Sequence, residues 1–185
     1  MPASPLLRPW TAADAPALHA AFAADPLLEH QLGCRLDDVG QAAAYLEANL
    51  AGSLQRRSFA VDVDGAAVGN IGLTAIDPRH QSAWVSYWLA PSVRGRSLAA
   101  RGVAAAADWA LGEGGLFRLE LGHRTNNPAS CRVAWKAGFQ PEGIERAKLR
   151  YGQARFDVET HARLASDPVP DIYPLPLQSP GPSTS

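Results

Sequence analysis

The chain has 185 residues, of which 46% are hydrophobic and 19% are charged, and its formal net charge is −1. These values are typical of one globular domain with a substantial core, and they give no electrostatic reason to expect nucleic acid or an anionic membrane as a partner. No apolar run is long enough to span a bilayer and no secretory leader is visible, so a cytoplasmic protein is expected.

Short alternating segments predict strands, and longer segments with helical periodicity and caps predict helices. Strands are expected at residues 6–10, 58–63, 67–73, 84–89, 116–121, 139–149 and 156–164. Helices are expected at residues 12–24, 39–50, 98–111 and 128–137. Residues 27–35 look irregular and are expected to form a substrate-facing loop. This order predicts a mixed α/β domain over residues 1–165, with helices on both faces of a sheet.

The remaining residues, 166–185, carry six prolines. This composition predicts a polyproline or disordered appendage outside the core, with a partner motif as a less common alternative. Truncation after Ala165 is therefore expected to leave the melting temperature unchanged.

A strand, a basic turn and a helix follow one another at residues 84–115, and the rest of the chain is organised around them. A helix N-terminus leaves amide groups unpaired and carries partial positive charge, and Arg94 and Arg96 add formal charge beside it. The stretch therefore predicts a site for a diphosphate. An ordinary strand-to-helix connection with two solvated arginines is the alternative.

Two blocks resemble the GNAT superfamily of N-acetyltransferases. Residues 94–99 (Arg-Gly-Arg-Ser-Leu-Ala) resemble its Arg/Gln-x-x-Gly-x-Gly/Ala signature, although Ser97 occupies the position of the first glycine. Residues 126–139, followed by Glu142-Gly143, resemble the Asn-x-x-Ser…Lys-x-Gly-Phe…Glu-Gly pattern of the RimJ/RimL-type ribosomal-protein acetyltransferases. Together the two blocks place the likeness over about residues 6–164.

The resemblance implies the GNAT fold, in which a mostly antiparallel, twisted sheet contains one splayed parallel strand pair. It also implies acetyl-coenzyme A as cosubstrate and a protein N-terminus or a small-molecule amine as acceptor; a homodimer is left open. The cofactor-binding residues that it implies are Trp88, Leu89, Arg94, Gly95, Arg96, Ser97, Leu98, Ala99 and Asn127.

The catalytic residues predicted are Ser130 and His123. The tyrosine with which many members protonate the departing thiolate maps to Ala134, so Ser130 is the candidate for that role; a helix serine satisfying local backbone donors is the alternative. His123, or else His80, is the candidate general base, acting through water.

Cys34 and Cys131, both expected to be free thiols, predict no disulfide framework and no metal site. A covalent acyl-cysteine would need a nearby base and an exposed thiolate, so direct transfer in a ternary complex is favoured. Three alternatives stay open: a coenzyme-binding module without catalysis, an acyltransferase for a larger donor such as succinyl-coenzyme A, and a scaffold that binds a partner through its Pro-rich tail.

Overall fold

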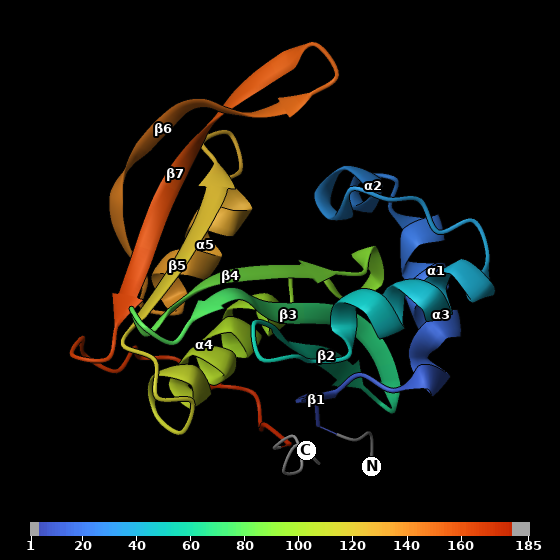
Figure 1. The fold of residues 1–185 in the computed structure, drawn as a ribbon, viewed down its shortest axis with the longest axis horizontal. Helices are drawn as coiled ribbons and strands as arrows, with labels where there is room; N and C mark the ends of the chain where they lie inside the picture. The colour runs from blue at the N-terminus through green and yellow to red at the C-terminus, as the bar shows by residue number, and fades with distance from the viewer. Residues whose placement is uncertain (1–3, 179–185) are drawn as a thin grey trace.

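Seven strands form one twisted sheet in the computed structural model, which describes residues 4–178 (Figure 1). The strands are β1 (Leu6–Pro9), β2 (Arg57–Val63), β3 (Ala66–Asp77), β4 (Ser82–Leu89), β5 (Arg118–Arg124), β6 (Gln140–Tyr151) and β7 (Ala154–Leu164). Their order in the sheet is β1-β2-β3-β4-β5-β7-β6. Among these strands β4 and β5 form the one parallel pair, and the other neighbours are antiparallel, which confirms the predicted mixed architecture.

Five α-helices and three shorter helical turns complete the described chain. The α-helices are α1 (Ala15–Ala24), α2 (Leu27–Leu32), α3 (Val39–Tyr45), α4 (Leu98–Leu111) and α5 (Pro128–Lys136). The shorter turns are η1 (Ala12–Asp14), η2 (Leu46–Leu50) and η3 (Pro91–Val93). None of the helices within residues 4–178 is long and apolar enough to cross a membrane.

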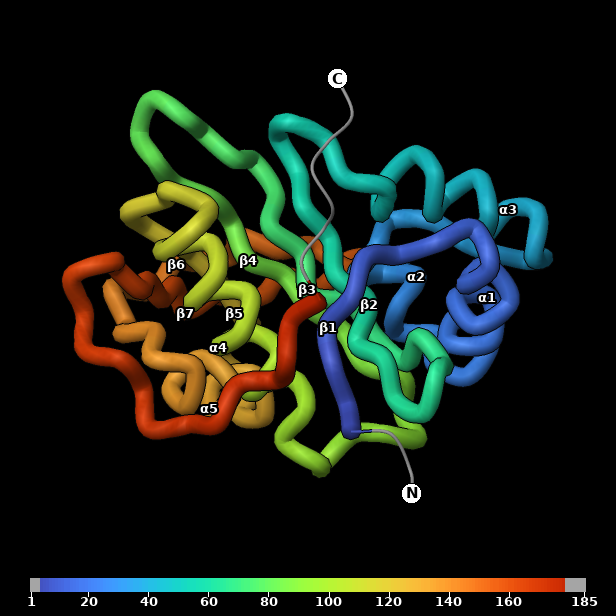
Figure 2. The backbone as a smooth tube through the Cα atoms, turned by 90° about the horizontal axis from the view of Figure 1, so that it is seen from below, coloured from blue at the N-terminus to red at the C-terminus, as the bar shows by residue number. Residues whose placement is uncertain are grey.

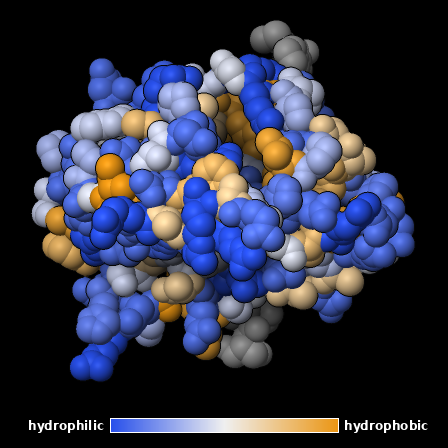
Figure 3. All heavy atoms as spheres, turned by 90° about the horizontal axis from the view of Figure 1, so that it is seen from above, coloured by the Kyte–Doolittle hydropathy of each residue, from blue (hydrophilic) through white to orange (hydrophobic). Residues whose placement is uncertain are grey.

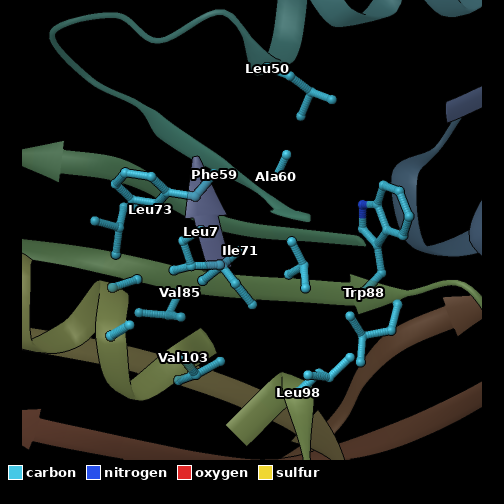
Figure 4. Close-up of a cluster of buried hydrophobic side chains, with 14 of the residues drawn as sticks. Leu7, Leu50, Phe59, Ala60, Ile71, Leu73, Val85, Trp88, Leu98 and Val103 are labelled. Carbon is cyan, nitrogen blue, oxygen red and sulfur yellow. The ribbon is translucent and has the colours of Figure 1, made fainter. Parts of the chain in front are cut away.

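The core lies on both faces of the central strands. On β2, Phe59 packs against Trp109 of α4 with ring centroids 5.6 Å apart, whereas Ala60 points toward Leu50 on the opposite side (Figure 4). Helix α4 lies close to the sheet because it has a glycine at position 102, where a Cβ atom would sit 3.1 Å from Ile71. The sheet therefore has α4 on one face and α1 and α3 on the other (Figure 1).

The parallel strands separate in the middle of the sheet. β4 and β5 pair only from Ser82 to Trp84 and from Arg118 to Glu120. Beyond Trp84, β4 continues to Leu89 beside β3, while β5 continues beside β7 and diverges from β4 (Figure 1). One edge of the second half of β4 is therefore left without a neighbouring strand.

The expected loop at residues 27–35 is wrong in part, because residues 27–32 form α2. The helix follows Pro26 and ends at Gly33, whose φ of 69° closes it in the left-handed conformation. Asp25 accepts a hydrogen bond from the Leu27 amide at its start. These are ordinary start and stop signals, but the helix is too short for its periodicity to be read from the sequence.

The interpretation of the C-terminal segment as an appendage outside the core is wrong for residues 172–178. The backbone of this segment pairs with Leu7 of β1 through Pro176 and Gln178, at 2.8 Å each, and Leu175 donates to the Arg101 carbonyl of α4 at 3.2 Å. Figure 2 shows the segment passing α5 and α4 to reach β1. Leu175 is 2% exposed because it fills the space that α4 and β1 leave open. Residues 179–185 lie outside the described part of the chain.

Candidate functional site

The free edge of β4 presents backbone groups to the gap between the splayed strands. The Tyr87 carbonyl accepts a hydrogen bond from Gln31 Nε2 at 2.7 Å, and the Leu89 carbonyl accepts one from Arg94 Nε at 3.0 Å. Both partners are side chains, which an extended ligand could displace by pairing with the strand edge. The backbone at Leu89, predicted to bind the cofactor, therefore lies at the open edge. The predicted Trp88 is different, since its ring is buried against Trp10 at 6.2 Å.

The turn from β4 to α4 forms a cradle of backbone amides. Gly95 has a φ of 78° and Ser97 a φ of 59°, so the chain turns its successive N–H groups toward one side. No residue within 4–178 accepts a hydrogen bond from the amides of residues 95–100. These amides stand at the N-terminus of the 14-residue helix α4, where the helix dipole favours an anion. The geometry is that of a phosphate-binding turn.

The two arginines of the turn have different surroundings. Arg94 forms an ion pair with Asp25, whose side chain is 8% exposed, and also donates to Leu89. Burial tends to raise the pKa of Asp25, but hydrogen bonds from Arg94 and the Leu27 amide lower it below its usual value. Arg94 therefore ties the turn to the end of α1. Arg96 is exposed and makes no ion pair within the described residues, so it is the arginine available to a diphosphate.

Ser97 occupies the position where the GNAT signature has glycine, and its left-handed φ explains the family's choice. An L-residue pays roughly 1–2 kcal/mol for this conformation, whereas glycine adopts it freely. Ser97→Gly relieves this strain, but glycine also makes the unfolded chain more flexible, which offsets part of the gain. We expect a net stabilisation of about 0.5–1 kcal/mol, and therefore a Tm higher by roughly 2–3 °C. Ser97→Ala, which keeps the strained φ, is the control for loss of the hydroxyl. A Tm for Ser97→Gly below that of the wild type in a thermal scan would contradict the inference that the backbone at Ser97 is strained.

Ser130 lies in the first turn of α5. Asn127 caps the helix, as predicted: its Oδ1 accepts from the Ser130 amide at 3.2 Å and its Nδ2 donates to Ser130 Oγ at 3.1 Å. Tyr87 of β4 donates its hydroxyl hydrogen to the same Oγ at 2.9 Å. With both lone pairs accepting, the Ser130 hydroxyl has its own hydrogen free to donate. This arrangement is that of a poised hydrogen-bond donor.

Tyr87 is the site residue that sequence reasoning missed. Period-two alternation places it on the α4 side of β4, but nothing in the local sequence shows that α5 brings Ser130 to it. Burial raises the pKa of Tyr87, and the hydrogen bond to Ser130 offsets this only in part. The phenol therefore stays protonated at neutral pH and acts as a donor to Ser130.

The structure does not support His123 as a general base. Its Nδ1 lies 3.0 Å from the Arg124 carbonyl and its Nε2 lies 3.0 Å from Nε2 of His161. The side chain is buried, and neither ring nitrogen is left for an incoming amine. The alternative, His80, lies in the exposed turn between β3 and β4, at the opposite end of β4 from Tyr87.

A pocket of about 480 Å³ lies between α2 and the tip of the β6–β7 hairpin. His30 and Tyr151 approach each other across it with ring centroids 5.5 Å apart. Its charged lining consists of Glu29, Arg35 and Arg150. Figure 3 looks onto this side of the molecule from above and shows apolar atoms in a hollow near its middle. The hairpin and α2 therefore flank the approach to the splayed strands.

A splayed parallel pair with a free strand edge, followed by a turn of free amides, suits a transferase whose donor is extended and carries a diphosphate. The family comparison agrees, since residues 6–140 match the acetyltransferase (GNAT) domain, and the chain belongs to this family. It is accordingly an acyl-coenzyme A-dependent acetyltransferase that uses acetyl-coenzyme A.

Curated relatives support this membership. The N-acetyltransferase YoaA of Bacillus subtilis, itself described as uncharacterized, is 24% identical over 85% of this chain and 91% of its own length. The ribosomal-protein-serine acetyltransferase of Escherichia coli is 28% identical over 58% of this chain and 60% of its own length.

Solved structures share the fold. RimJ of Mycobacterium smegmatis, in complex with a coenzyme A disulfide, is 26% identical with a TM-score of 0.75, over 89% of this chain and 86% of that one. RimL, a ribosomal L7/L12 α-N-protein acetyltransferase in complex with coenzyme A, is 22% identical with a TM-score of 0.76, over 87% and 94%. A chimera of the spermidine N-acetyltransferase SpeG of Vibrio cholerae is 20% identical with a TM-score of 0.76, over 89% and 97%.

Proposed function

We propose that this acetyltransferase transfers the acetyl group of acetyl-coenzyme A directly to the N-terminal amine of a peptide or protein, within a ternary complex. The observation that carries the proposal is the Ser130 hydroxyl, which Tyr87 and Asn127 hold at the gap between β4 and β5 with its hydrogen free. A cofactor that lies on the cradle and runs along β4 brings its thioester to this hydroxyl.

The cofactor would be held mainly by backbone. Its diphosphate would accept hydrogen bonds from the amides of residues 95–99, with Arg96 adding charge. Its pantetheine arm would pair with the free edge of β4 at Tyr87 and Leu89, displacing the Gln31 contact. Arg94 would stay with Asp25 and keep the turn in place. Asn127 would act through Ser130 rather than touch the cofactor, since both of its side-chain groups are already engaged.

The chemistry balances without a covalent intermediate. The neutral amine attacks the thioester carbonyl, and the tetrahedral intermediate collapses as its C–S bond breaks. The departing sulfur gains a proton from the Ser130 hydroxyl, while the nitrogen loses one to water. The hydrogen bonds from Tyr87 and Asn127 stabilise the charge that develops on Ser130 Oγ, which then recovers a proton from solvent. Water replaces His123 as the base, since the rings of His123 and His161 face each other.

The charges that line the pocket between α2 and the β6–β7 hairpin favour an N-terminal amine over a polyamine as the acceptor. A polyamine carries several positive charges and needs several carboxylates to bind it. The pocket here has one carboxylate, Glu29, against the two guanidinium groups of Arg35 and Arg150. Arg35 is partly neutralised by Asp37 at 3.2 Å, but the lining still carries no excess of negative charge.

Thiol release tests the proposal. The protein is mixed with acetyl-coenzyme A and either short peptides with free N-termini or spermidine, and N-terminally blocked peptides serve as the control. We expect release with free peptides, several-fold slower release with spermidine, and none above the hydrolysis background with blocked peptides. Faster turnover with spermidine than with free peptides would contradict the proposal that the acceptor is an N-terminal amine. Binding of acetyl-coenzyme A without release on any amine would instead show a coenzyme-binding module, and release only with succinyl-coenzyme A would correct the donor.

A further inference from the structure

Four side chains that the acyl-transfer site does not use converge beneath α5. His123 lies on β5, Glu159 and His161 lie on β7, and Cys131 lies on α5. Their candidate ligand atoms all lie within 4.8 Å of one another. The sheet register explains three of them, because His123 is paired directly with Glu159 and His161 follows two residues later on the same face. Helix α5 packs over that face and supplies the fourth.

The two imidazoles face each other through their Nε2 atoms. Nδ1 of His123 lies 3.0 Å from the Arg124 carbonyl, and Nδ1 of His161 lies 3.5 Å from the Phe139 carbonyl. A carbonyl can only accept, so a neutral ring that donates from Nδ1 to its carbonyl carries a lone pair on Nε2. The two Nε2 atoms are 3.0 Å apart in a buried site. Two facing lone pairs repel each other unless a proton or a cation lies between them.

The other two groups also offer electron pairs to the same point. A carboxylate oxygen of Glu159 lies 3.3 Å from Nε2 of His123 and 3.2 Å from Nε2 of His161, and Cys131 Sγ lies 3.8 Å from that oxygen. Tetrahedral zinc, with Zn–N and Zn–O distances near 2.0–2.1 Å and Zn–S near 2.3 Å, separates its ligand atoms by roughly 3.3–3.8 Å. The separations among the two Nε2 atoms and the carboxylate oxygen are within a few tenths of an ångström of that geometry. All four ligand atoms lie within 4.8 Å of one another, so Cys131 Sγ would move inward by up to about 1 Å to complete it.

We propose that this cluster is a structural Zn²⁺ site. One thiolate and one carboxylate neutralise the two charges of the ion, and the two imidazoles bind as neutral ligands, so the occupied cluster has no net charge to bury. Binding displaces the proton of the Cys131 thiol into solvent. The carbonyls of Arg124 and Phe139 hold both histidines in the ligating tautomer, as outer-shell partners of metal sites do. Four protein ligands close the coordination, which is typical of a structural rather than a catalytic ion.

The proposed zinc site differs from the sequence-based expectation that the chain has no metal site. Two cysteines predict no zinc framework, and no short ligand motif links His123 to His161, because the ligands come from three elements. The fold instead combines one cysteine with two histidines and a carboxylate. Since Cys131 directly follows Ser130, zinc would fasten the first turn of α5 to β5 and β7.

Metal binding by the full-length, tag-free protein tests the site without reference to activity. After treatment with a chelator and its removal, the protein is titrated with Zn²⁺ and scanned thermally. We expect one ion per chain and a rise in Tm of about 5–10 °C at a hundredfold excess over Kd. Replacement by Co²⁺ should give a thiolate-to-cobalt charge-transfer band in the near ultraviolet.

Ligand variants identify the residues. Cys131→Ser and Glu159→Gln, whose side chains are half-buried, are expected to fold, to bind Zn²⁺ at least tenfold more weakly and to lose most of the Tm rise. Only Cys131→Ser should abolish the cobalt band. Cys34→Ser, which removes the other cysteine far from the cluster, is the matched control and should behave as the wild type. A wild-type Tm that Zn²⁺ leaves unchanged would show that a shared proton fills the cluster and would overturn the proposal. Equal affinity in Cys131→Ser and the wild type would also overturn it.

Discussion

Replacing Ser130 with alanine lowers kcat by ~10²-fold or more and leaves acetyl-coenzyme A affinity nearly unchanged, since the hydroxyl acts on the departing sulfur rather than on the bound cofactor. The expected cost in stability is at most about 1 kcal/mol, because Asn127 still caps α5 through the backbone amide of residue 130. Stopped-flow thiol release measures kcat, and calorimetric titration measures the affinity.

The companion variants separate proton donation from packing. Tyr87→Phe, which removes the donor to Ser130 and keeps the ring, should lower kcat by a smaller factor than Ser130→Ala. Ser86→Ala, an exposed serine on the same strand, is the matched control and should turn over at the wild-type rate. The loss in Ser130→Ala should shrink for acyl donors with more acidic thiols, which leave without help. Wild-type turnover in Ser130→Ala would end its assignment as the donor.

Replacing Leu175 with alanine destabilises the fold by about 2–4 kcal/mol and lowers Tm by roughly 5–15 °C, as truncation of a fully buried leucine does. The reason is that Leu175 is 2% exposed and its amide is bonded to the Arg101 carbonyl of α4. A thermal scan measures the shift. Val169→Ala is the control from the same C-terminal part of the chain, after residue 165. Val169 is 82% exposed, so this change should alter Tm by less than about 2 °C.

Truncation after Ala165 is the stronger version of this test. It removes Leu175 and the backbone hydrogen bonds to Leu7 together, so its Tm should fall at least as far as that of Leu175→Ala. A truncated chain with the wild-type Tm would restore the interpretation of residues 166–178 as an appendage.

The local features of the site could be predicted from the sequence because local chemistry determines them. Helix α4 occupies the expected residues 98–111, since alanines favour the helix and Gly112 ends it. The Asn127-Pro128 pair starts α5 as predicted, and Gly138 follows it with a φ of 85°. Ser97 marks the left-handed position of the turn, as the family signature suggests.

The contacts between distant segments could not be predicted in this way. Tyr87 reaches Ser130 over 43 residues of sequence, and His123 reaches His161 over 38. The first contact depends on how α5 packs on the sheet and the second on the pairing of β5 with β7, and no local pattern in the sequence determines either. The packing of the C-terminal segment is likewise invisible in its proline-rich composition, because the surface on β1 and α4 that buries Leu175 exists only after the sheet has formed.

The most direct measurement of the central claim is the mass of a peptide with a free N-terminus after incubation with acetyl-coenzyme A and the enzyme. The account predicts a gain of one acetyl group, located on the terminal amine by fragmentation, with the wild type and with Ser86→Ala, and at least ~10²-fold less product per unit time with Ser130→Ala. Modification at the same rate by Ser130→Ala and the wild type, or no modified peptide with the wild type under conditions in which it binds acetyl-coenzyme A, would contradict it.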